Sequence, residues 1–480
     1  MKKNSELSTQ NGRPASKAPF SQKISSGAAS SNDVDRPTIL IIIGVTGDLS
    51  KRKLLPAIGD MAAAGVLPKQ FRILGITRQH SVTPSDILEG VRNAAYIQEH
   101  LTVFPMSLED AADYERLRSH LHAIAQLWGD AAQCLWYLAV PPTTAWPIIE
   151  QLGYSGLSRL PNTKLLLEKP FGIDRASAEE LVAHVERSFA MGQVYRIDHY
   201  LAKETVQNIV VFRQDNALFE RTWNRDAIER IDILANETIG IEGRAAFYEQ
   251  TGALRDLVQS HLLQLAALTL MTLPPDRELG RIPEARRALL STLTVDPGSV
   301  ERGQYADYRR EVANPASMVE TFVSLTLFSS DPRWQDVPIT LTTGKALSEK
   351  RTDIIVTYRR GGAPQQNRLT LRLQPNEGVE LCFFAKRPGY DRTIERVPLT
   401  FTYADHFEAL PDAYGRVVLD ALRGDHTLFA SSGEVLESWR IVDTVRKSWE
   451  SSADTLIVYP RGASPEHVLR KNLWDQHAGG

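Results

Sequence analysis

The sequence of 480 residues predicts an α/β domain with a doubly wound parallel sheet over residues 37–197, followed by a larger α+β domain over residues 198–480. The first prediction rests on apolar strand-like runs that alternate with helical patterns. The second rests on strand-like runs that cluster with few helices between them, which favours a mostly antiparallel sheet. These runs are Arg230–Ala235, Val319–Phe328, Val337–Thr343, Asp353–Tyr358, Leu369–Leu373 and Val379–Ala385. Residues 1–36 are rich in Ser, Ala, Asn, Lys and Pro, and we expect a disordered tail there.

The first expected strand is Thr38–Gly44, a continuous β-branched run typical of a central strand buried on both faces. It leads into the turn GVTGDL at residues 44–49, and a helix is expected to begin at Ser50. This combination forms an anion site, because free backbone N–H groups and the positive end of the helix dipole face the turn. The order of strand, turn and helix is Rossmann-type and indicates a dinucleotide pyrophosphate, although the spacing is not G-x-G-x-x-G.

The next expected strand, Phe71–Ile76, indicates which dinucleotide is bound. An acid at the end of this strand suits the ribose hydroxyl of NAD, whereas an arginine suits the 2′-phosphate of NADP. No acid stands at the strand end, and Arg78 does. The position favours NADP, and a solvated loop arginine is the alternative.

Two further strands are expected in the same sheet, at Cys134–Val140 and Lys164–Leu167. The second runs into the segment Glu168-Lys169-Pro170, where parallel strands deliver functional loops at their carboxyl ends. A lysine there can contact both the nicotinamide and a sugar hydroxyl. The alternative is an ion pair between Glu168 and Lys169.

The densest group of reactive side chains is the segment Arg196–Glu204, which reads RIDHYLAKE. Its acids, bases, imidazole and phenol fan around one axis instead of lining one solvated face, and this indicates a site. The alternative is a solvated helix start in which Lys203 pairs with a neighbouring acid.

A second imidazole, His261, lies in the helical pattern Thr251–Leu270, on the side that carries the apolar residues. A histidine on an apolar face is often a satisfied core residue. It can instead be a general base if a carboxylate from elsewhere in the chain reaches its ring.

Together these segments resemble the glucose-6-phosphate dehydrogenase family, and they occur in the order and spacing of that family over roughly residues 37–470. The segments that carry the resemblance are Gly44–Ala57, the EKPFG of residues 168–172, RIDHYLAKE, the GALRDLVQSHLLQ of residues 252–264, the GKAL of residues 344–347 and the QPNE of residues 374–377. The resemblance implies oxidation of glucose 6-phosphate to 6-phosphogluconolactone with NADP.

The resemblance also implies a role for each matching residue. His261 matches the general base, and Asp198 matches the carboxylate that orients it. Expected substrate contacts are Lys169, His199, Tyr200, Lys203, Glu237, Glu249, Lys345, Lys350 and Gln374, of which His199, Tyr200 and Lys203 match phosphate ligands. Expected cofactor contacts are Gly44, Thr46, Gly47, Asp48, Leu49, Arg78 and Lys169. No metal ion is expected.

Several positions depart from the usual pattern of the family. Ala202 replaces a glycine, and Ser260 replaces an asparagine before the base histidine. Glu249 stands where an aspartate usually contacts the sugar, and its extra methylene moves the carboxylate by about an ångström. None of these changes removes the base, its partner or the phosphate ligands.

Composition narrows the class of protein further. A net charge of −3 gives no reason to expect nucleic acid as a partner, and no apolar run reaches transmembrane length. Two cysteines make a disulfide framework improbable, so we expect a reducing compartment, the cytoplasm. The resemblance implies a homodimer or homotetramer that pairs through the large sheet.

Two other functions stay open from the sequence. One is a different NADP-linked sugar dehydrogenase that also uses a Glu-Lys-Pro segment, but that group lacks the segments RIDHYLxKE and GKAL. The other is a catalytically silent NADP-binding regulatory or scaffold protein. Such a protein is expected to lose His261 or Asp198, and both are present.

Overall fold

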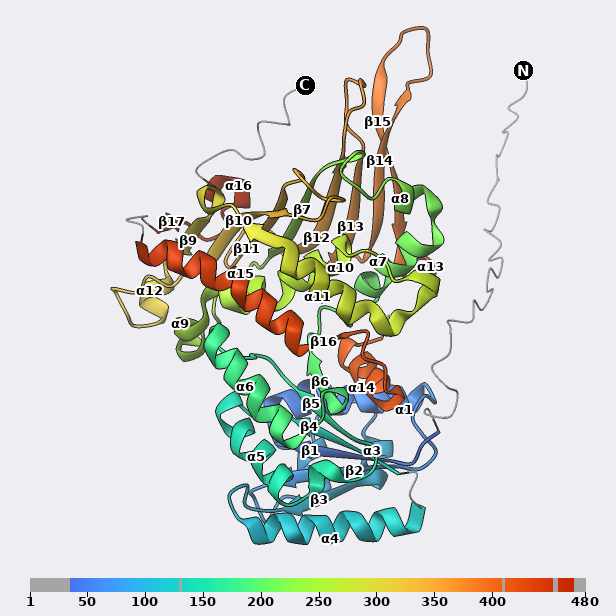
Figure 1. Cartoon of the computed structure of the whole chain (residues 1–480), viewed down its shortest axis with the longest axis vertical. Helices are drawn as coiled ribbons and strands as arrows, with labels where there is room; N and C mark the ends of the chain where they lie inside the picture. The colour runs from blue at the N-terminus through green and yellow to red at the C-terminus, as the bar shows by residue number, and fades with distance from the viewer. Residues whose placement is uncertain (1–34, 129–131, 408–410, 452–455, 470–480) are drawn as a thin grey trace, which may run out of the picture.

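The structure is a computed structural model that describes residues 35–128, 132–407, 411–451 and 456–469. Its two β-sheets form two units stacked along the long axis (Figure 1). All but the last two residues of the expected N-terminal tail lie outside the described residues. None of the described helices is long and apolar enough to cross a membrane.

The first sheet has seven strands in the order β16-β6-β5-β4-β1-β2-β3. Its strands are β1 (Thr38–Ile43), β2 (Phe71–Thr77), β3 (Leu101–Pro105), β4 (Gln133–Leu138), β5 (Thr163–Leu167), β6 (Val194–Ile197) and β16 (Phe429–Ala430). Strands β1 to β6 are parallel to their neighbours, and only β16 pairs antiparallel. The order 3-2-1-4-5-6 is that of a doubly wound dinucleotide-binding sheet, so the predicted fold class is confirmed.

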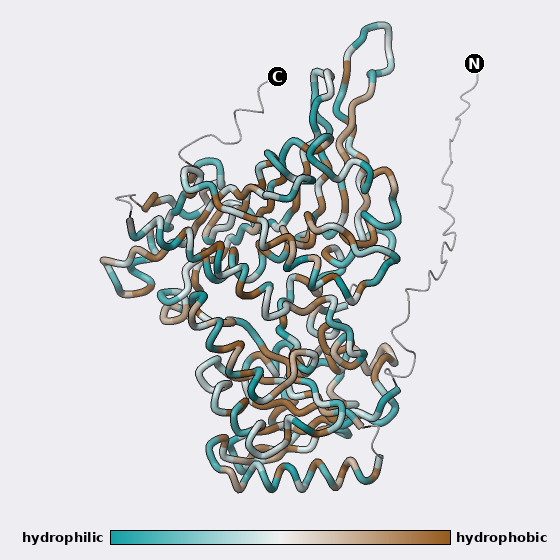
Figure 2. The backbone as a smooth tube through the Cα atoms, in the orientation of Figure 1, coloured by the Kyte–Doolittle hydropathy of each residue, from teal (hydrophilic) through white to brown (hydrophobic). Residues whose placement is uncertain are grey.

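Helices cover both faces of this sheet because both faces of its central strand are apolar. Ile39, Ile41 and Ile43 of β1 pack towards α4 (Ala111–Trp128), α5 (Pro142–Tyr154) and α6 (Arg175–Ser188). Leu40 and Ile42 pack towards η1 (Ser50–Leu54), α1 (Leu55–Ala63), α2 (Pro84–Leu88), α3 (Ala94–His100) and α14 (Ala413–Arg423). In the hydropathy view, teal and brown alternate along α4 at the base of the molecule, as expected for a helix with one buried face (Figure 2).

The second sheet has ten strands, ordered β15-β14-β13-β12-β7-β11-β10-β9-β17 with β8 paired to β10. Its strands are β7 (Ile228–Asn236), β8 (Leu293–Val295), β9 (Glu301–Tyr305), β10 (Phe322–Ser329), β11 (Ile339–Gly344), β12 (Arg351–Tyr358), β13 (Arg368–Gln374), β14 (Gly378–Lys386), β15 (Ile394–Thr402) and β17 (Ile457–Tyr459). Only the pairs β7–β11 and β9–β17 are parallel, so the sheet is mostly antiparallel, as predicted.

Most helices of this second unit lie on one face of the sheet or at its lower edge, and the last helix lies beside the terminal strand β17 (Figure 1). They are α7 (Glu204–Asp215), α8 (Ala217–Arg221), α9 (Ala245–Ala253), η4 (Leu254–Leu262), α10 (Leu263–Leu270), α11 (Ile282–Thr292), α12 (Tyr308–Glu311), α13 (Tyr403–His406), α15 (Ser432–Ser451) and α16 (Pro465–Val468). Single 3₁₀ turns occur at η2 (Leu157–Arg159), η3 (Met191–Gln193), η5 (Pro275–Arg277), η6 (Leu279–Arg281) and η7 (Pro297–Ser299).

The helix expected over Thr251–Leu270 is a π-helix flanked by α-helix on both sides. Gly252 has a φ of +61°, which breaks α9 from η4. The carboxylate of Glu320 occupies the place where a Cβ at Gly252 would lie, and its Oε1 accepts the Leu254 N–H at 2.9 Å. The segment η4 is a π-helix, and α10 then continues as an ordinary α-helix.

The chain returns to the first sheet late in the sequence, so this sheet is not built from residues 37–197 alone. Helix α14 packs on α1, and β16 pairs with β6 at the sheet edge. The fully buried Arg286 of α11 holds this return segment by donating to Glu434 at 2.6 Å and to the carbonyls of Thr427 and Phe429 at 2.7 Å each. The boundary at residues 197 and 198 stays a prediction.

Candidate active site

The candidate site lies where the carboxyl end of the first sheet meets helix η4. Strand β6 ends at Ile197 and delivers Asp198, while η4 delivers His261. His261 Nδ1 lies 2.6 Å from Asp198 Oδ1, and both residues are almost completely buried. The expectation that a carboxylate from elsewhere in the chain reaches the ring of His261 is therefore confirmed.

The surroundings of His261 fix its tautomer. Asp198 Oδ1 also accepts the Tyr200 N–H at 2.9 Å, so it acts as an acceptor and Nδ1 of His261 carries the hydrogen. Nε2 is left with its lone pair, which accepts from the Lys169 ammonium at 2.9 Å. Burial, and then the charge on Lys169, lower the pKa of His261 well below its usual value, while burial raises the pKa of Asp198 to about 6. Near neutral pH this gives a neutral imidazole backed by a carboxylate.

Lys169 links the base to a second carboxylate, Asp256. Its ammonium lies 3.1 Å from Asp256 Oδ1 and 3.2 Å from the Asp256 carbonyl oxygen. Burial alone raises the pKa of Asp256, but the charges on Lys169 and Lys345 outweigh it and hold the pKa below its usual value. Asp256 therefore stays ionised beside the lysine.

A cationic end of the site is built by Lys203 and its neighbours. Lys203 Nζ donates to Gln374 Oε1 at 2.8 Å and lies 4.8 Å from the ring centroid of Tyr200. The Tyr200 ring in turn stacks on His261, with 4.1 Å between centroids. Burial lowers the pKa of Lys203 to about 8, and the positive charge of the exposed Lys350 contributes. An anion bound here offsets this desolvation.

Glu237 and Lys345 line the candidate site on the side of the second sheet. They follow the neighbouring parallel strands β7 and β11 and form an ion pair. The charge on Lys345 acts on Asp256, and that on Glu237 acts on Tyr200. The structure therefore gathers the expected residues Lys169, His199, Tyr200, Lys203, Glu237, Lys345, Lys350 and Gln374 around the His261–Asp198 pair.

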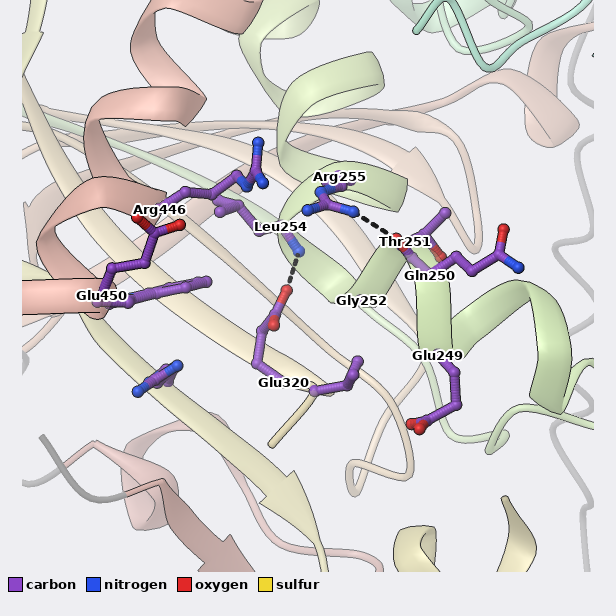
Figure 3. Close-up of a pocket in the computed structure, with 12 residues that line it drawn as sticks. Glu249, Gln250, Thr251, Gly252, Leu254, Arg255, Glu320, Arg446 and Glu450 are labelled. Atoms are coloured by element: carbon purple, nitrogen blue, oxygen red, sulfur yellow. Dashed lines mark hydrogen bonds between the residues drawn. The ribbon is translucent and has the colours of Figure 1, made fainter. Parts of the chain in front are cut away.

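Glu249 is the expected sugar contact that the structure does not bring to this group. Its carboxylate accepts from Tyr308, Asn314 and Ser317, at the edge of a different pocket (Figure 3). The pattern in the sequence therefore pointed to the wrong acid, because the carboxylate beside Lys169 is Asp256. Asp256 and His261 are five residues apart, which separates them on an α-helix but brings them to adjacent turns where η4 forms i→i+5 hydrogen bonds.

The expected cofactor turn has the shape that a dinucleotide requires. Gly44 has a φ of +90°, and a Cβ there would lie 2.6 Å from the Ala139 carbonyl oxygen. The Gly47 N–H and the Ser50 hydroxyl both donate to the Gly44 carbonyl oxygen at 3.0 Å, which closes the turn. Thr46, Gly47, Asp48 and Leu49 lead directly into η1, so the first N–H groups of that helix face the carboxyl edge of the sheet. Arg78 is exposed immediately after β2.

The strand order, the glycine turn and a buried His–Asp base beside a lysine define an NAD(P)-linked oxidoreductase. Models of two successive domains match the chain: "Glucose-6-phosphate dehydrogenase, NAD binding domain" over residues 41–208, and "Glucose-6-phosphate dehydrogenase, C-terminal domain" over residues 210–477. The chain belongs to the glucose-6-phosphate dehydrogenase family, whose members act on a CH–OH donor.

Curated relatives and solved structures agree with this family. Glucose-6-phosphate 1-dehydrogenase of Chlamydia muridarum is 35% identical over 458 residues, with 86% of this chain and 90% of the relative covered. Glucose-6-phosphate 1-dehydrogenase 2 of Mycobacterium tuberculosis is 36% identical over 459 residues, with 86% and 88% covered. A solved glucose-6-phosphate dehydrogenase in complex with its substrate glucose-6-phosphate aligns with a TM-score of 0.88 and 27% identity over 93% of this chain and 99% of that chain.

A more distant structural relative shares the fold alone. The transcriptional regulator Gal80p of a Kluyveromyces yeast aligns over 87% of this chain and 90% of its own, with a TM-score of 0.51 and 12% identity. This architecture therefore does not by itself imply catalysis, and the residues of the site carry the functional argument.

The electrostatics of His261 can be tested without any ligand. Because its pKa lies well below 6.5, lowering the pH from 8 to 6 should leave the ring neutral, with the hydrogen on Nδ1. Nitrogen-15 NMR of histidine-labelled protein measures this, and the signal missing from the His261→Asn variant identifies the ring. A His261 ring that is protonated at pH 7 would contradict the assignment.

Proposed function

We propose that this protein oxidises D-glucose 6-phosphate to 6-phospho-D-glucono-1,5-lactone with NADP as acceptor, the first step of the oxidative pentose phosphate pathway. The observation that carries the proposal is the buried His261–Asp198 pair. Its second ring nitrogen, Nε2 of His261, faces away from Asp198 and accepts from Lys169. The two curated relatives and the solved substrate complex are all named glucose-6-phosphate dehydrogenase, which supports the choice of substrate.

The chemistry assigns the base role to His261. When bound, the nicotinamide dinucleotide accepts the hydride from C1 of the sugar. Nε2 of His261 takes the proton of the C1 hydroxyl, and the ionised Asp198 stabilises the imidazolium that forms. The hydroxyl takes the place that the Lys169 ammonium holds at Nε2, while Asp256 still offers that ammonium a partner at 3.1 Å.

The phosphate is assigned to Lys203, His199 and Tyr200. Lys203 supplies the charge, because its ammonium is largely desolvated and its protein partner there is the neutral amide of Gln374. Burial lowers the pKa of His199 to about 3, so this imidazole is neutral and binds through its N–H. Lys350 adds a second positive charge at the open side.

NADP is assigned as the preferred dinucleotide on the basis of Arg78. The turn of Gly44, Thr46, Gly47, Asp48 and Leu49 supports binding of the pyrophosphate, because it joins a buried parallel strand to the start of a helix. Arg78 follows the strand that in this fold ends beside the adenosine ribose, and a guanidinium there matches a 2′-phosphate.

We further propose a homodimer or homotetramer that associates through the large sheet. Strand β15 supports this, since Ile394 and Leu399 are more than half exposed on it. Sedimentation velocity measures the oligomeric state, and a monomer at micromolar concentration would contradict the proposed association.

Both cysteines, Cys134 and Cys382, are buried and form no disulfide, which supports the expected cytoplasmic location.

Replacing the base should abolish most of the chemistry and leave substrate binding nearly intact. His261→Asn removes the proton acceptor, and turnover should fall by at least ~10²–10⁴-fold with a small change in KM. Reduction of NADP followed at 340 nm measures both. The matched control is His184→Asn, whose ring contacts the Trp146 carbonyl on α5, away from the site. An unchanged turnover of the His261 variant would refute the assignment.

Arg78 should set the preference between the two dinucleotides. Arg78→Ala removes a charge-assisted contact to the 2′-phosphate, so NADP should bind about 10–150-fold more weakly while NAD is nearly unaffected. Titration of each cofactor against the protein measures this. Arg72→Ala, at the opposite end of β2, is the matched control and should change neither affinity. Equal weakening of both cofactors would make Arg78 structural.

Lys203→Ala should separate binding of the phosphate from oxidation of the sugar. The phosphate does not change charge during the reaction, so KM should rise with turnover largely kept, a loss of roughly 10–150-fold in kcat/KM. Any oxidation of free glucose should be nearly unaffected, because glucose has no phosphate. Lys386→Ala, which removes a lysine at the end of β14, is the control. Equal proportional losses for the two substrates would refute the phosphate assignment.

A further inference from the structure

A small cavity lies beside the carboxylate of Asp198, and its lining is mostly apolar but includes several buried polar side chains. Its volume is about 20 Å³, and residues from the end of β6, from η4, from α10 and from α15 line it. Asp198, Gln264 and Ser438 are at most 4% exposed and contribute to the wall. The cavity is too small for a substrate or cofactor.

Each of these three residues turns one unsatisfied polar atom to the interior. Oδ1 of Asp198 is taken by His261 and the Tyr200 N–H, but Oδ2 has no hydrogen-bond partner in the described part of the chain. The same holds for Gln264 Oε1 and Ser438 Oγ. Buried polar groups are rarely left without a partner, so three around one cavity indicate something that joins them.

One water molecule has the size and the hydrogen-bonding capacity to join them. A cavity of about 10–15 Å³ or more holds a water if two to four polar partners surround it. The Ser438 hydroxyl can donate to the water oxygen, and its two hydrogens can go to Asp198 Oδ2 and Gln264 Oε1. Each of the three unsatisfied atoms then has one partner.

We propose that a single bound water in this cavity connects Asp198 to Ser438 and Gln264, and that these two residues position the catalytic carboxylate. The proposal rests on the proposed function for its catalytic meaning, although the water site itself does not. With Oδ1 held by His261 and the Tyr200 N–H and Oδ2 held by the water, the carboxylate cannot rotate away from the ring. Helix α15 thereby acts on the base without touching the substrate.

The water should also favour the ionised form of Asp198, because it donates to that carboxylate. Removing it makes protonation easier, so activity should be lost at a higher pH as the solution is acidified. The titratable and charged groups that face Asp198 are His261, His199, Lys169, Glu168, Lys203, Arg286 and Tyr200. Substitution at Ser438 or Gln264 leaves all of them in place.

The kinetic test uses Ser438→Ala in the full chain, with glucose 6-phosphate and NADP. The acid limb of kcat/KM should move to higher pH, with about 3–10-fold less activity than wild type near pH 6 and little difference near pH 8. KM for the sugar near pH 8 should not change, because Ser438 does not contact the substrate. Gln264→Met, which keeps the length of the side chain, should shift the same limb and serves if the first variant does not fold. Thr444→Ala, which removes an exposed hydroxyl of α15, should keep the wild-type profile.

The structural test is a crystal structure of the wild-type protein at high resolution. One ordered water within hydrogen-bond distance of Asp198 Oδ2, Gln264 Oε1 and Ser438 Oγ is the expected result. A dry cavity, or wild-type pH profiles for both variants, would overturn the inference. If the wild type does not oxidise glucose 6-phosphate, the proposed function fails, and the crystal structure still decides the water site.

Discussion

The hydrogen bond between His261 and Asp198 is the interaction on which the rest of this structure depends. It requires two polar groups to be almost completely removed from water, so each must be held where the other compensates it. The parallel sheet fixes one partner at the end of β6, and the π-wound η4 fixes the other. The site exists only because both units deliver their residue to the same place.

Two of the other lysines of the site are paired with acids in the protein itself. Lys169 contacts Asp256 and Lys345 contacts Glu237, so each of these two cations has an acid beside it. Lys203 differs, because its protein partner is the amide of Gln374 and burial lowers its pKa to about 8. Burial outweighs the charge of the nearby Glu377 on Lys203, and under the proposed function a bound phosphate dianion adds the missing negative charge.

Local patterns in the sequence were sufficient to predict much of the fold and the centre of the candidate site. The run Thr38–Gly44 indicated β1, and RIDHYLAKE marked the centre of the site. A period of 3.6 residues could not reveal that η4 is a π-helix. Glu249 was expected from the family resemblance, and only the fold shows that Asp256 is the acid beside Lys169 while Glu249 lies elsewhere. Nor could the sequence reveal β16, since two residues carry no periodicity and their pairing with β6 is set by contacts with α11.

The return of residues 413–430 to the first sheet determines how this molecule can be divided. A cut after residue 197 leaves β6 as an open edge strand, with free N–H and C=O groups that invite pairing with other chains. The same cut leaves α14 without α1, so its apolar face meets solvent. Exchange of the nucleotide-binding unit between relatives therefore needs two crossover points, so that residues 413–430 are exchanged together with it.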